Sequence, residues 1–281
     1  MAIRLGKNNY GKQRVRVLQV VRRPDRHDIK ELTLSIRLEG DFELAHTKGD
    51  NRKVLPTDTM KNTVYALAKQ HAIESPEEFC LRLAEHFLSR NPQVSRVRVE
   101  AAQTLWSRLS VEGKPHPHTF TSSTSEKRTA ALSATREEKT LHAEIEGLVV
   151  LKTTDSAFEN FLRDQYTTLK EDRDRILATA IRAAWLYRDN PADFDSTWHG
   201  VRQTLLESFA GHDSESLQHT LYAMGEAVLK KFTGIREVHL SLPNKHYNLF
   251  NLSPFHLDNP KEIFLPTDEP HGLIEATLSN D

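Results

Sequence analysis

Four short segments of the chain carry more reactive side chains than folding alone requires. They are "NNYGK" (8–12), "PTDTMKNT" (56–63), "SAFENFLRDQYTTLKEDRDRILAT" (156–179) and "SLPNKHY" (241–247). In the first segment, Lys12 stands just ahead of a run of alternating apolar residues. A lysine placed there can serve as a base once it is neutral, or it can simply follow a glycine turn into solvent.

The second segment lies where strand-like alternation gives way to a helical pattern. A Thr57 or Asp58 at such a junction is typical of a helix N-cap, whose side-chain oxygen accepts a backbone N–H of the first turn. The same position favours a nearby anion, because the N-terminus of a helix presents free N–H groups. Capping and anion binding are compatible, and a further hypothesis is that the Thr57 hydroxyl transfers protons.

The third segment combines phenylalanines with arginines. Phe158 and Phe161 can be ordinary core residues, and Arg163, Arg173 and Arg175 can be solvated or paired with the many carboxylates around them. The functional interpretation requires one arginine to fork onto a planar anion while a phenylalanine stacks on the face of that anion. Both interpretations remain open at this point.

The fourth segment places an amide and an imidazole on one face of a strand, because Asn244 and His246 are two residues apart. Such a pair suits a polar ligand, and the alternative is a hydrogen-bonded strand end. Elsewhere, "KPHPHTF" sets His116 and His118 at strand spacing, where they could chelate zinc. Neither an acidic partner nor an HExxH helix is nearby, and the chain has no GxGxxG, P-loop or GxSxG motif.

Composition excludes other classes of protein. The 38 basic and 39 acidic residues nearly cancel, which argues against general nucleic-acid binding, and no basic run suits a membrane surface. The single cysteine, Cys80, cannot support a disulfide framework or a CxxC motif. The chain shows no signal peptide, no apolar run of membrane-spanning length and no C-terminal Ser-Lys-Leu peroxisomal signal. We therefore expect a soluble, cytoplasmic protein.

Hydrophobic periodicity predicts the elements that hold these side chains. Period-two alternation predicts a first hairpin, with strands around Val15–Val21 and Leu32–Leu38, that continues outward through "LEGDFELA" and a Gly-Asp pair that could be a bulge. Further strands are expected in "VSRVRVEAAQTLW", "HTFTSS", "KRTAALSAT", "TLHAEIEGLVVLKT", "RILATAIRAAWLYR" and "IREVHLSLPNKHYNLF". Helices are expected in "DTMKNTVYALAKQ", "SPEEFCLRLAEHFLSR" (with Ser75 as N-cap), "FDSTWHGVRQTLLESFAG" and "SESLQHTLYAMGEAVLKKF".

The order of elements occurs twice. Helix, short turn and amphipathic strand follow one another in "AEHFLSRNPQVSRVRVEAAQ" and again in "GEAVLKKFTGIREVHLSLPN". This predicts a tandem duplication, with one repeat at 1–137 and a second at 138–281. Each repeat would be an α+β unit, an antiparallel sheet with its helices on one face. Two such sheets leave exposed edges, so we expect an obligate oligomer in which the sheets join into a barrel.

Taken together, these motifs resemble the urate oxidase (uricase) family, nearly from end to end. The matching segments occur in the family's order: "NNYGK", "TDTMKNTVYALAK", "GKPHPHTF", "GLVVLKTTDSAFENFLRDQYTTL", "DRILAT", "LQHTLYAMGEAVL" and "SLPNKHY". The resemblance implies tandem tunnelling-fold (T-fold) repeats and a homotetramer that encloses a tunnel and has active sites at subunit interfaces. It also implies oxidation of urate by dioxygen to 5-hydroxyisourate and hydrogen peroxide, with no metal and no organic cofactor.

The resemblance further assigns catalytic roles. It implies that Lys12 and Thr57 form a proton-relay pair, and that His246 completes the catalytic set. Thr57 and Asp58 are also implied to bind substrate, and Asp58 would neighbour the network on the oxygen side. The absence of a peroxisomal signal then points to a bacterial-type cytosolic enzyme.

Roles in substrate binding follow from the same resemblance. Phe158 would stack on the purine, and Arg175 would fork onto one edge of it. Gln218 would pair with the opposite edge, helped by the backbone of Leu217, where some relatives have valine. Asn244 would sit above the ring, where dioxygen or water binds.

Two alternatives remain open. A zinc-dependent T-fold enzyme that handles pterins or purines would need a clustered Cys-His set, which the sequence does not show. A catalytically inactive purine-binding relative would not need Lys12, Thr57 and His246, all of which are present.

Overall fold

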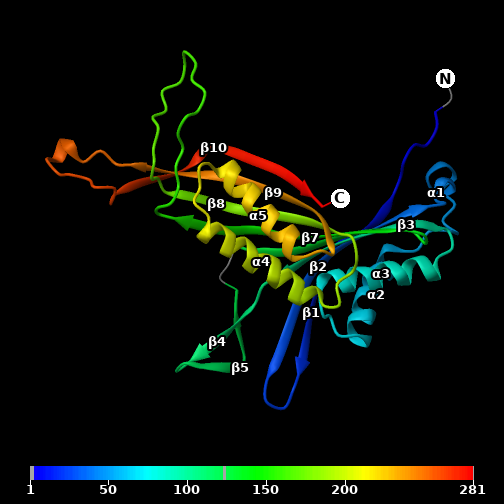
Figure 1. The fold of residues 1–281 in the computed structure, drawn as a ribbon. Helices are drawn as coiled ribbons and strands as arrows, with labels where there is room; N and C mark the ends of the chain where they lie inside the picture. Colours follow the sequence, from blue (N-terminus) through cyan, green and yellow to red (C-terminus); the bar gives the residue numbers. More distant parts are fainter. Residues whose placement is uncertain (1–2, 123–124, 281) are drawn as a thin grey trace. The chain divides into compact units, whose positions relative to one another are not determined.

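The computed structural model describes residues 3–122 and 125–280 (Figure 1). The chain divides into two compact units. Unit 1 comprises Met1–Glu144 with Asn190–Asp195, and unit 2 comprises Ile145–Asp189 with Ser196–Asp281. Compactness is a different property from internal duplication, so the repeat boundary between 137 and 138 stays a prediction.

Unit 1 is an antiparallel sheet with helices, as the α+β expectation requires. Its strands pair in the order β1-β2-β3-β6, followed by the start of β7. These strands are β1 (Tyr10–Arg22), β2 (His27–Gly40), β3 (Val94–Thr104), β6 (Lys127–Ala134) and β7 (Lys139–Lys152). A separate hairpin is formed by β4 (Ser107–Val111) and β5 (Lys114–Thr121). The last residue of the predicted "HTFTSS" strand, Ser123, lies outside the described residues.

Two helices of unit 1 pack on its sheet, α2 (Thr57–Gln70) and α3 (Pro76–Arg90). The short helix α1 (Glu43–Lys48) has no buried residue. Helix α2 packs on β1, and α3 packs on β3 and β6. The predicted cap of α3 is confirmed, since the Ser75 hydroxyl accepts the Glu78 N–H at 3.0 Å. The apolar stripe that begins at Phe79 is fully buried, which explains why this helix lies on the sheet.

The predicted outward continuation of the first hairpin is wrong. Strand β2 ends at Gly40, and the short helix α1 follows. The reason is Phe42, which is only 2% exposed and packs edge-on against Tyr10 at 4.8 Å between ring centroids. Burying this ring turns the chain back towards the sheet. The pairing of β2 with β3 does shift register between Glu39 and Gly40, close to the predicted bulge.

Ion pairs to Asp195, next to a buried pair, tie residues 190–195 to the rest of unit 1. Arg128 on β6 pairs with Glu77 at 2.7 Å, and both side chains are almost wholly buried. Arg128 also pairs with Asp195, which in turn accepts Lys30 at 2.7 Å. Burial raises the pKa of Glu77, and the positive charge of Arg128 acts in the opposite direction. Breaking such a buried pair typically costs about 3–5 kcal/mol.

Unit 2 repeats the same plan. The rest of β7 is followed in its sheet by β8 (Leu177–Tyr187), β9 (Ile235–Leu249) and β10 (Phe264–Ser279). Figure 1 shows α4 (Phe194–Gly211) beside α5 (Leu217–Lys231) over one face of these strands, and α5 packs on β9 and β10. A single 3₁₀ turn, η1 (Ser253–Phe255), lies between β9 and β10. The predicted stripe of α5 is confirmed, since Leu217, Leu221, Met224 and Val228 are all buried.

None of the helices among the described residues combines the length and the apolar character needed to cross a membrane.

Candidate active site

A glycine and a β-bulge fix the direction of Lys12 on β1. Strand β1 runs so close to β2 at Gly11 that a Cβ there would lie 1.8 Å from the carbonyl oxygen of Ile36. The register of the pair shifts between Lys12 and Val15, and Arg14 adopts a left-handed φ of 57°. Bulges commonly re-aim side chains next to active sites. Lys12 is half-buried at this irregularity.

The close approach at Gly11 predicts a large effect on stability. Replacing Gly11 by alanine forces β1 and β2 apart, because the added methyl group meets backbone that cannot rotate away. We expect the free energy of unfolding to fall by about 1–3 kcal/mol, as for other overpacked sites. The matched control is Gly6→Ala, since a Cβ at Gly6 meets nothing within 4 Å. Equal urea midpoints for the two variants would contradict the prediction.

Neither Thr57 nor Asp58 is the N-cap of α2, although the sequence suggested that one of them would be. Helix α2 begins at Thr57, its N-cap residue is Pro56, and no side chain caps it. The N-cap interpretation of Thr57 or Asp58 is therefore wrong. The physical reason is that Pro56, with ψ of 138°, already supplies the extended residue that precedes the first helical turn.

Asp58 forms hydrogen bonds within its own helix and interacts electrostatically with Lys12. Its carboxylate accepts Lys61 Nζ at 2.6 Å and Asn62 Nδ2 at 3.0 Å. The hydrogen bond from Lys61 is the main cause that lowers the pKa of Asp58, and the charge of Lys12 adds to it. Lys12 and the first turn of α2 thus lie at the same end of unit 1.

In unit 2, the three arginines of the third segment are distinguished by their partners. Arg163 pairs with Glu171 at 3.5 Å, and Arg173 pairs with Glu159 at 2.9 Å. Arg175 is half-buried and pairs with no carboxylate within 4.0 Å among the residues that the structure describes. Its Nε is buried and without a hydrogen-bond partner there. Burial lowers the pKa of the Arg175 guanidinium, and the charge of Asp172 acts in the opposite direction.

Arg175 lies over the ring of Phe158. Its guanidinium carbon is 5.2 Å from the ring centroid, and Phe158 also stacks on Phe161 with centroids 5.0 Å apart and planes 12° apart. The segment folds back on itself to achieve this, as Figure 1 shows in the long excursion between β7 and β8. Phe158 N donates to Asp172 O at 2.7 Å, and Arg175 N donates to Ser156 O at 2.8 Å. A stacking ring and a cation without a carboxylate partner are therefore held side by side.

The same segment is bonded to the loop that leads into α5. Ala157 N donates to Ser214 O at 2.7 Å, and Ser214 N donates to Asp155 O at 3.0 Å. The N-cap Ser216 then accepts the His219 N–H at 3.1 Å, and α5 begins at Leu217. The free N–H groups of this helix end favour an anion nearby. The side chain of Leu217 is apolar and buried, so only its backbone N–H and C=O can bond a polar ligand. The side chain of Gln218 is exposed.

Asn244 and His246 lie on β9, both half-buried and on the same face, as predicted. Asn244 is opposite Thr179 of β8, and His246 is opposite Thr267 of β10. Thr179 follows Arg175 by four residues. The short segment after Arg175 therefore leads into β8, where Thr179 pairs with Asn244. Unit 2 thus contains the residues predicted to stack, to fork and to supply an amide, on segments linked by backbone hydrogen bonds and strand pairing.

Sequence reasoning missed several polar residues around this set. Ser156 and Thr179 are almost wholly buried, and their hydroxyl oxygens have no partner among the described residues. Ser156 is the first residue of the third segment and Thr179 is the last, so their place in that motif was the signal that could have pointed to them. Tyr10, whose hydroxyl accepts the Leu55 N–H, lies within "NNYGK", so the motif was again the available signal.

The histidines weighed as zinc ligands lie close together on β5. The rings of His116 and His118 are 4.6 Å apart between centroids. Across the described ranges, 3–122 and 125–280, no group of three or more His, Cys, Asp or Glu side chains is arranged to hold a metal ion.

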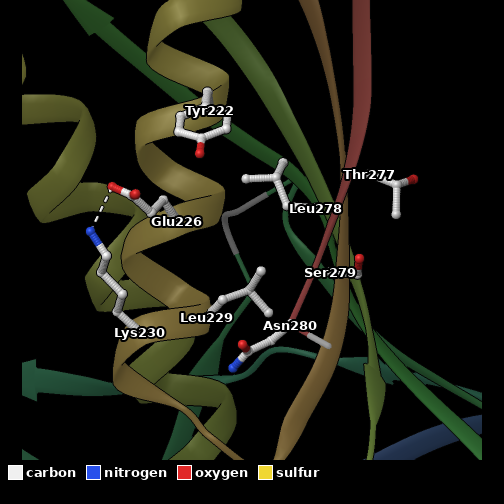
Figure 2. Close-up of a pocket in the computed structure, with 8 residues that line it drawn as sticks. All are labelled: Tyr222, Glu226, Leu229, Lys230, Thr277, Leu278, Ser279 and Asn280. Atoms are coloured by element: carbon white, nitrogen blue, oxygen red, sulfur yellow. Dashed lines mark ion pairs between the residues drawn. The ribbon is translucent and has the colours of Figure 1, made fainter.

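A pocket in unit 2 is separate from the candidate residues. It has a volume of about 410 Å³ and lies between α5 and β10 (Figure 2). Its lining residues are Tyr222, Glu226, Leu229, Lys230, Thr277, Leu278, Ser279 and Asn280. Lys12, Thr57 and Asp58 belong to unit 1, whereas the other candidate residues belong to unit 2. A pocket within one unit is therefore not expected to contain the whole candidate set.

Comparisons with known proteins identify the family to which the chain belongs. The uricase family model matches residues 8–133 and 141–275. A uricase from Arthrobacter globiformis is 47% identical over 99% of this chain and 90% of its own length. A uricase from Aspergillus flavus is 38% identical over 96% of this chain and 94% of its own length.

Solved uricase structures have the same fold as this chain. The crystal structure of the uricase from Arthrobacter globiformis superposes with a TM-score of 0.93 and covers 100% of this chain and 96% of that one. The urate oxidase of Bacillus sp. TB-90, only 22% identical, superposes with a TM-score of 0.82 over 97% of this chain and 100% of that chain, and shows the shared fold. The α+β tunnelling fold expected from the sequence is thus confirmed. The chain belongs to the uricase family.

Proposed function

We propose that this chain oxidises urate with dioxygen to 5-hydroxyisourate and hydrogen peroxide, and that it needs no metal or organic cofactor. One observation carries the proposal furthest. Arg175 is a half-buried cation with an unpartnered Nε, and it lies beside the face of Phe158. Such a pair suits a small, flat, anionic aromatic molecule, and membership of the uricase family names urate as that molecule.

Binding follows from the shape and charge of urate, which is planar and already anionic near neutral pH. Phe158 stacks on the ring system, which contributes on the order of 1–3 kcal/mol by analogy with aromatic stacking on nucleobases. Arg175 forks onto one edge of the substrate, because a guanidinium matches a pair of acceptors bidentately. The Gln218 amide and the Leu217 N–H hold the opposite edge, and Asn244 holds dioxygen or water above the ring.

The chemistry requires a proton acceptor. Ground-state dioxygen is a triplet and reacts slowly with closed-shell molecules, so urate must first become a better electron donor. Removal of a second proton achieves this. Thr57 takes that proton as it passes its own hydroxyl proton to neutral Lys12, and His246 completes the catalytic set. The urate dianion then gives two electrons to dioxygen, which takes one proton back from the Lys12–Thr57 relay and one from solvent and leaves as hydrogen peroxide. A water molecule then adds to the oxidised ring, with its hydroxyl on the oxidised carbon and its proton on a ring nitrogen.

We also propose that the active site is shared between subunits of a homotetramer. Lys12, Thr57 and Asp58 belong to the first predicted repeat, 1–137, and the remaining candidate residues belong to the second, 138–281. Strands β1 and β10 are edge strands, and edge strands are normally covered or paired. Pairing between subunits would bring the first-repeat set of one chain to the second-repeat set of another. A cytoplasmic location accompanies this proposal.

Loss of urate absorbance tests the function directly. In aerobic buffer we expect urate to disappear with one hydrogen peroxide formed per urate, and exhaustive chelation should leave the rate unchanged. Removing dioxygen should stop the reaction. A rate that falls on chelation and returns with zinc would instead support the zinc-dependent T-fold alternative. Urate binding without turnover would support the inactive relative.

A further inference from the structure

Three attachments hold helix α2 along strand β1. Near the end of the helix, the Gln19 side chain donates to His71 O at 3.1 Å and accepts the Ile73 N–H at 2.8 Å. Near its middle, Tyr65 Oη donates to Arg16 O at 3.1 Å. The third attachment, from Tyr10, precedes the helix. The proposed relay residues, Lys12 and Thr57, lie one on each of the elements joined in this way.

Tyr10 links the strand to the segment just before α2. Its hydroxyl oxygen accepts the Leu55 N–H at 2.9 Å, and its ring packs edge-on against the buried Phe42. Burial raises the pKa of Tyr10, and the hydrogen bond from Leu55 acts in the opposite direction. The hydroxyl therefore stays protonated and acts here as a neutral acceptor whose position is fixed by the packed ring.

The Tyr10–Leu55 bond lies the same short distance along the chain from each relay residue. Tyr10 precedes Lys12 by two residues, and Leu55 precedes Thr57 by two residues. Pro56 fixes its own φ and restricts Leu55 to extended conformations, so the connection from Leu55 to Thr57 is stiff. The connection from Tyr10 to Lys12 is held by the close contact of Gly11 with Ile36. The Tyr10–Leu55 bond thus joins two stiff segments, each of which ends at a relay residue.

We propose that Tyr10 is a positioning residue that sets the separation of Lys12 and Thr57. This inference rests on the proposed relay. Without the hydroxyl, Leu55 N–H loses its acceptor, and the first turn of α2 drifts relative to β1. The other two attachments keep the rest of the helix in place. The expected defect is therefore one of proton transfer, with the fold and the urate-binding residues of unit 2 retained.

The test is Tyr10→Phe, which keeps the ring and removes the acceptor. We expect kcat to fall roughly tenfold with little change in KM for urate, because small misplacements of reacting groups slow chemistry more than binding. The control is Tyr65→Phe, which also removes a tyrosine hydroxyl bonded to backbone, here one that donates from α2 to Arg16 O on β1, farther from the relay. Its kcat should stay within about twofold of wild type. Urea unfolding of both variants verifies that they fold.

Combination with Thr57→Ala separates this inference from the proposed function. If Tyr10 acts through the relay, adding Tyr10→Phe to Thr57→Ala should lower kcat no further, since residues acting as a unit are not additive. A normal kcat for Tyr10→Phe beside a severely impaired Thr57→Ala would overturn the role of Tyr10 and leave the relay intact. Equal losses in Tyr10→Phe and Tyr65→Phe would overturn it too, because they would indicate a general loosening of α2. Full activity of Thr57→Ala would reject the relay itself, and the role of Tyr10 with it.

Discussion

Thr57→Ala and Lys12→Met should each lower kcat by roughly 10²–10⁴-fold, the usual contribution of a positioned general base. The double variant should be hardly worse than either single variant, because a proton that passes through both groups is lost when either is absent. Steady-state kinetics with urate measure all three. Neither residue caps α2 or forms part of the core, so both variants should fold and the loss should appear in turnover.

Thr59→Ala is the matched control for the threonine. Thr59 is exposed on the same first turn of α2, so its loss removes a hydroxyl without touching the proposed relay. It should keep nearly full activity. Losses from Lys12→Met and Thr57→Ala that multiply in the double variant would mean that the two residues do separate tasks.

Mixing two inactive variants should restore about a quarter of wild-type activity. Thr57→Ala damages the first-repeat set, and Arg175→Ala damages the second-repeat set. In a two-fold symmetric dimer with shared sites, one site of each mixed dimer collects both defects and the other collects neither. Equal random mixing makes about half of the dimers mixed, so roughly a quarter of all sites are intact. The measurement is urate turnover after joint refolding of the two variants.

The control for this experiment mixes Thr57→Ala with Lys12→Met. Both changes lie in the first-repeat set, so every site of a mixed dimer carries one defect and no activity should return. Mass spectrometry verifies that mixed oligomers are present. Equal recovery in both mixtures, or none in either, would show that sites are not shared in the proposed way.

Local patterns predicted those elements of the fold whose burial alternates simply. Val15 and Val17 of β1 and the leucines of β2 are buried at alternate positions, and Ser75 caps α3 with the residue type and spacing that such a cap requires. Strand β10 was not predicted, because Pro266 and Pro270 interrupt its sequence and its pairing with β9 shifts register between Thr267 and Gly272. Alternation cannot be recognised across such a break.

In the candidate site, too, local spacing predicted some features and long-range contacts decided others. The types and spacing of Asn244 and His246 were enough to place both on one face of a strand. The choice among Arg163, Arg173 and Arg175 was not available from spacing, since it depends on which carboxylates the folded segment brings near each one. The attachment of Tyr10 to Leu55 joins residues 45 positions apart, and no periodicity encodes a contact of that range.

The return of residues 190–195 to unit 1 means that the chain passes between the two units three times, after residues 144, 189 and 195. No single cut can therefore divide this protein into halves that each retain all their own parts. A fragment ending near residue 137 would keep Arg128, Glu77 and Lys30 but lose Asp195, which is a carboxylate partner of both Arg128 and Lys30. Unit 1 is therefore complete only once synthesis has passed through the first segment of unit 2, 145–189, and reached residue 195.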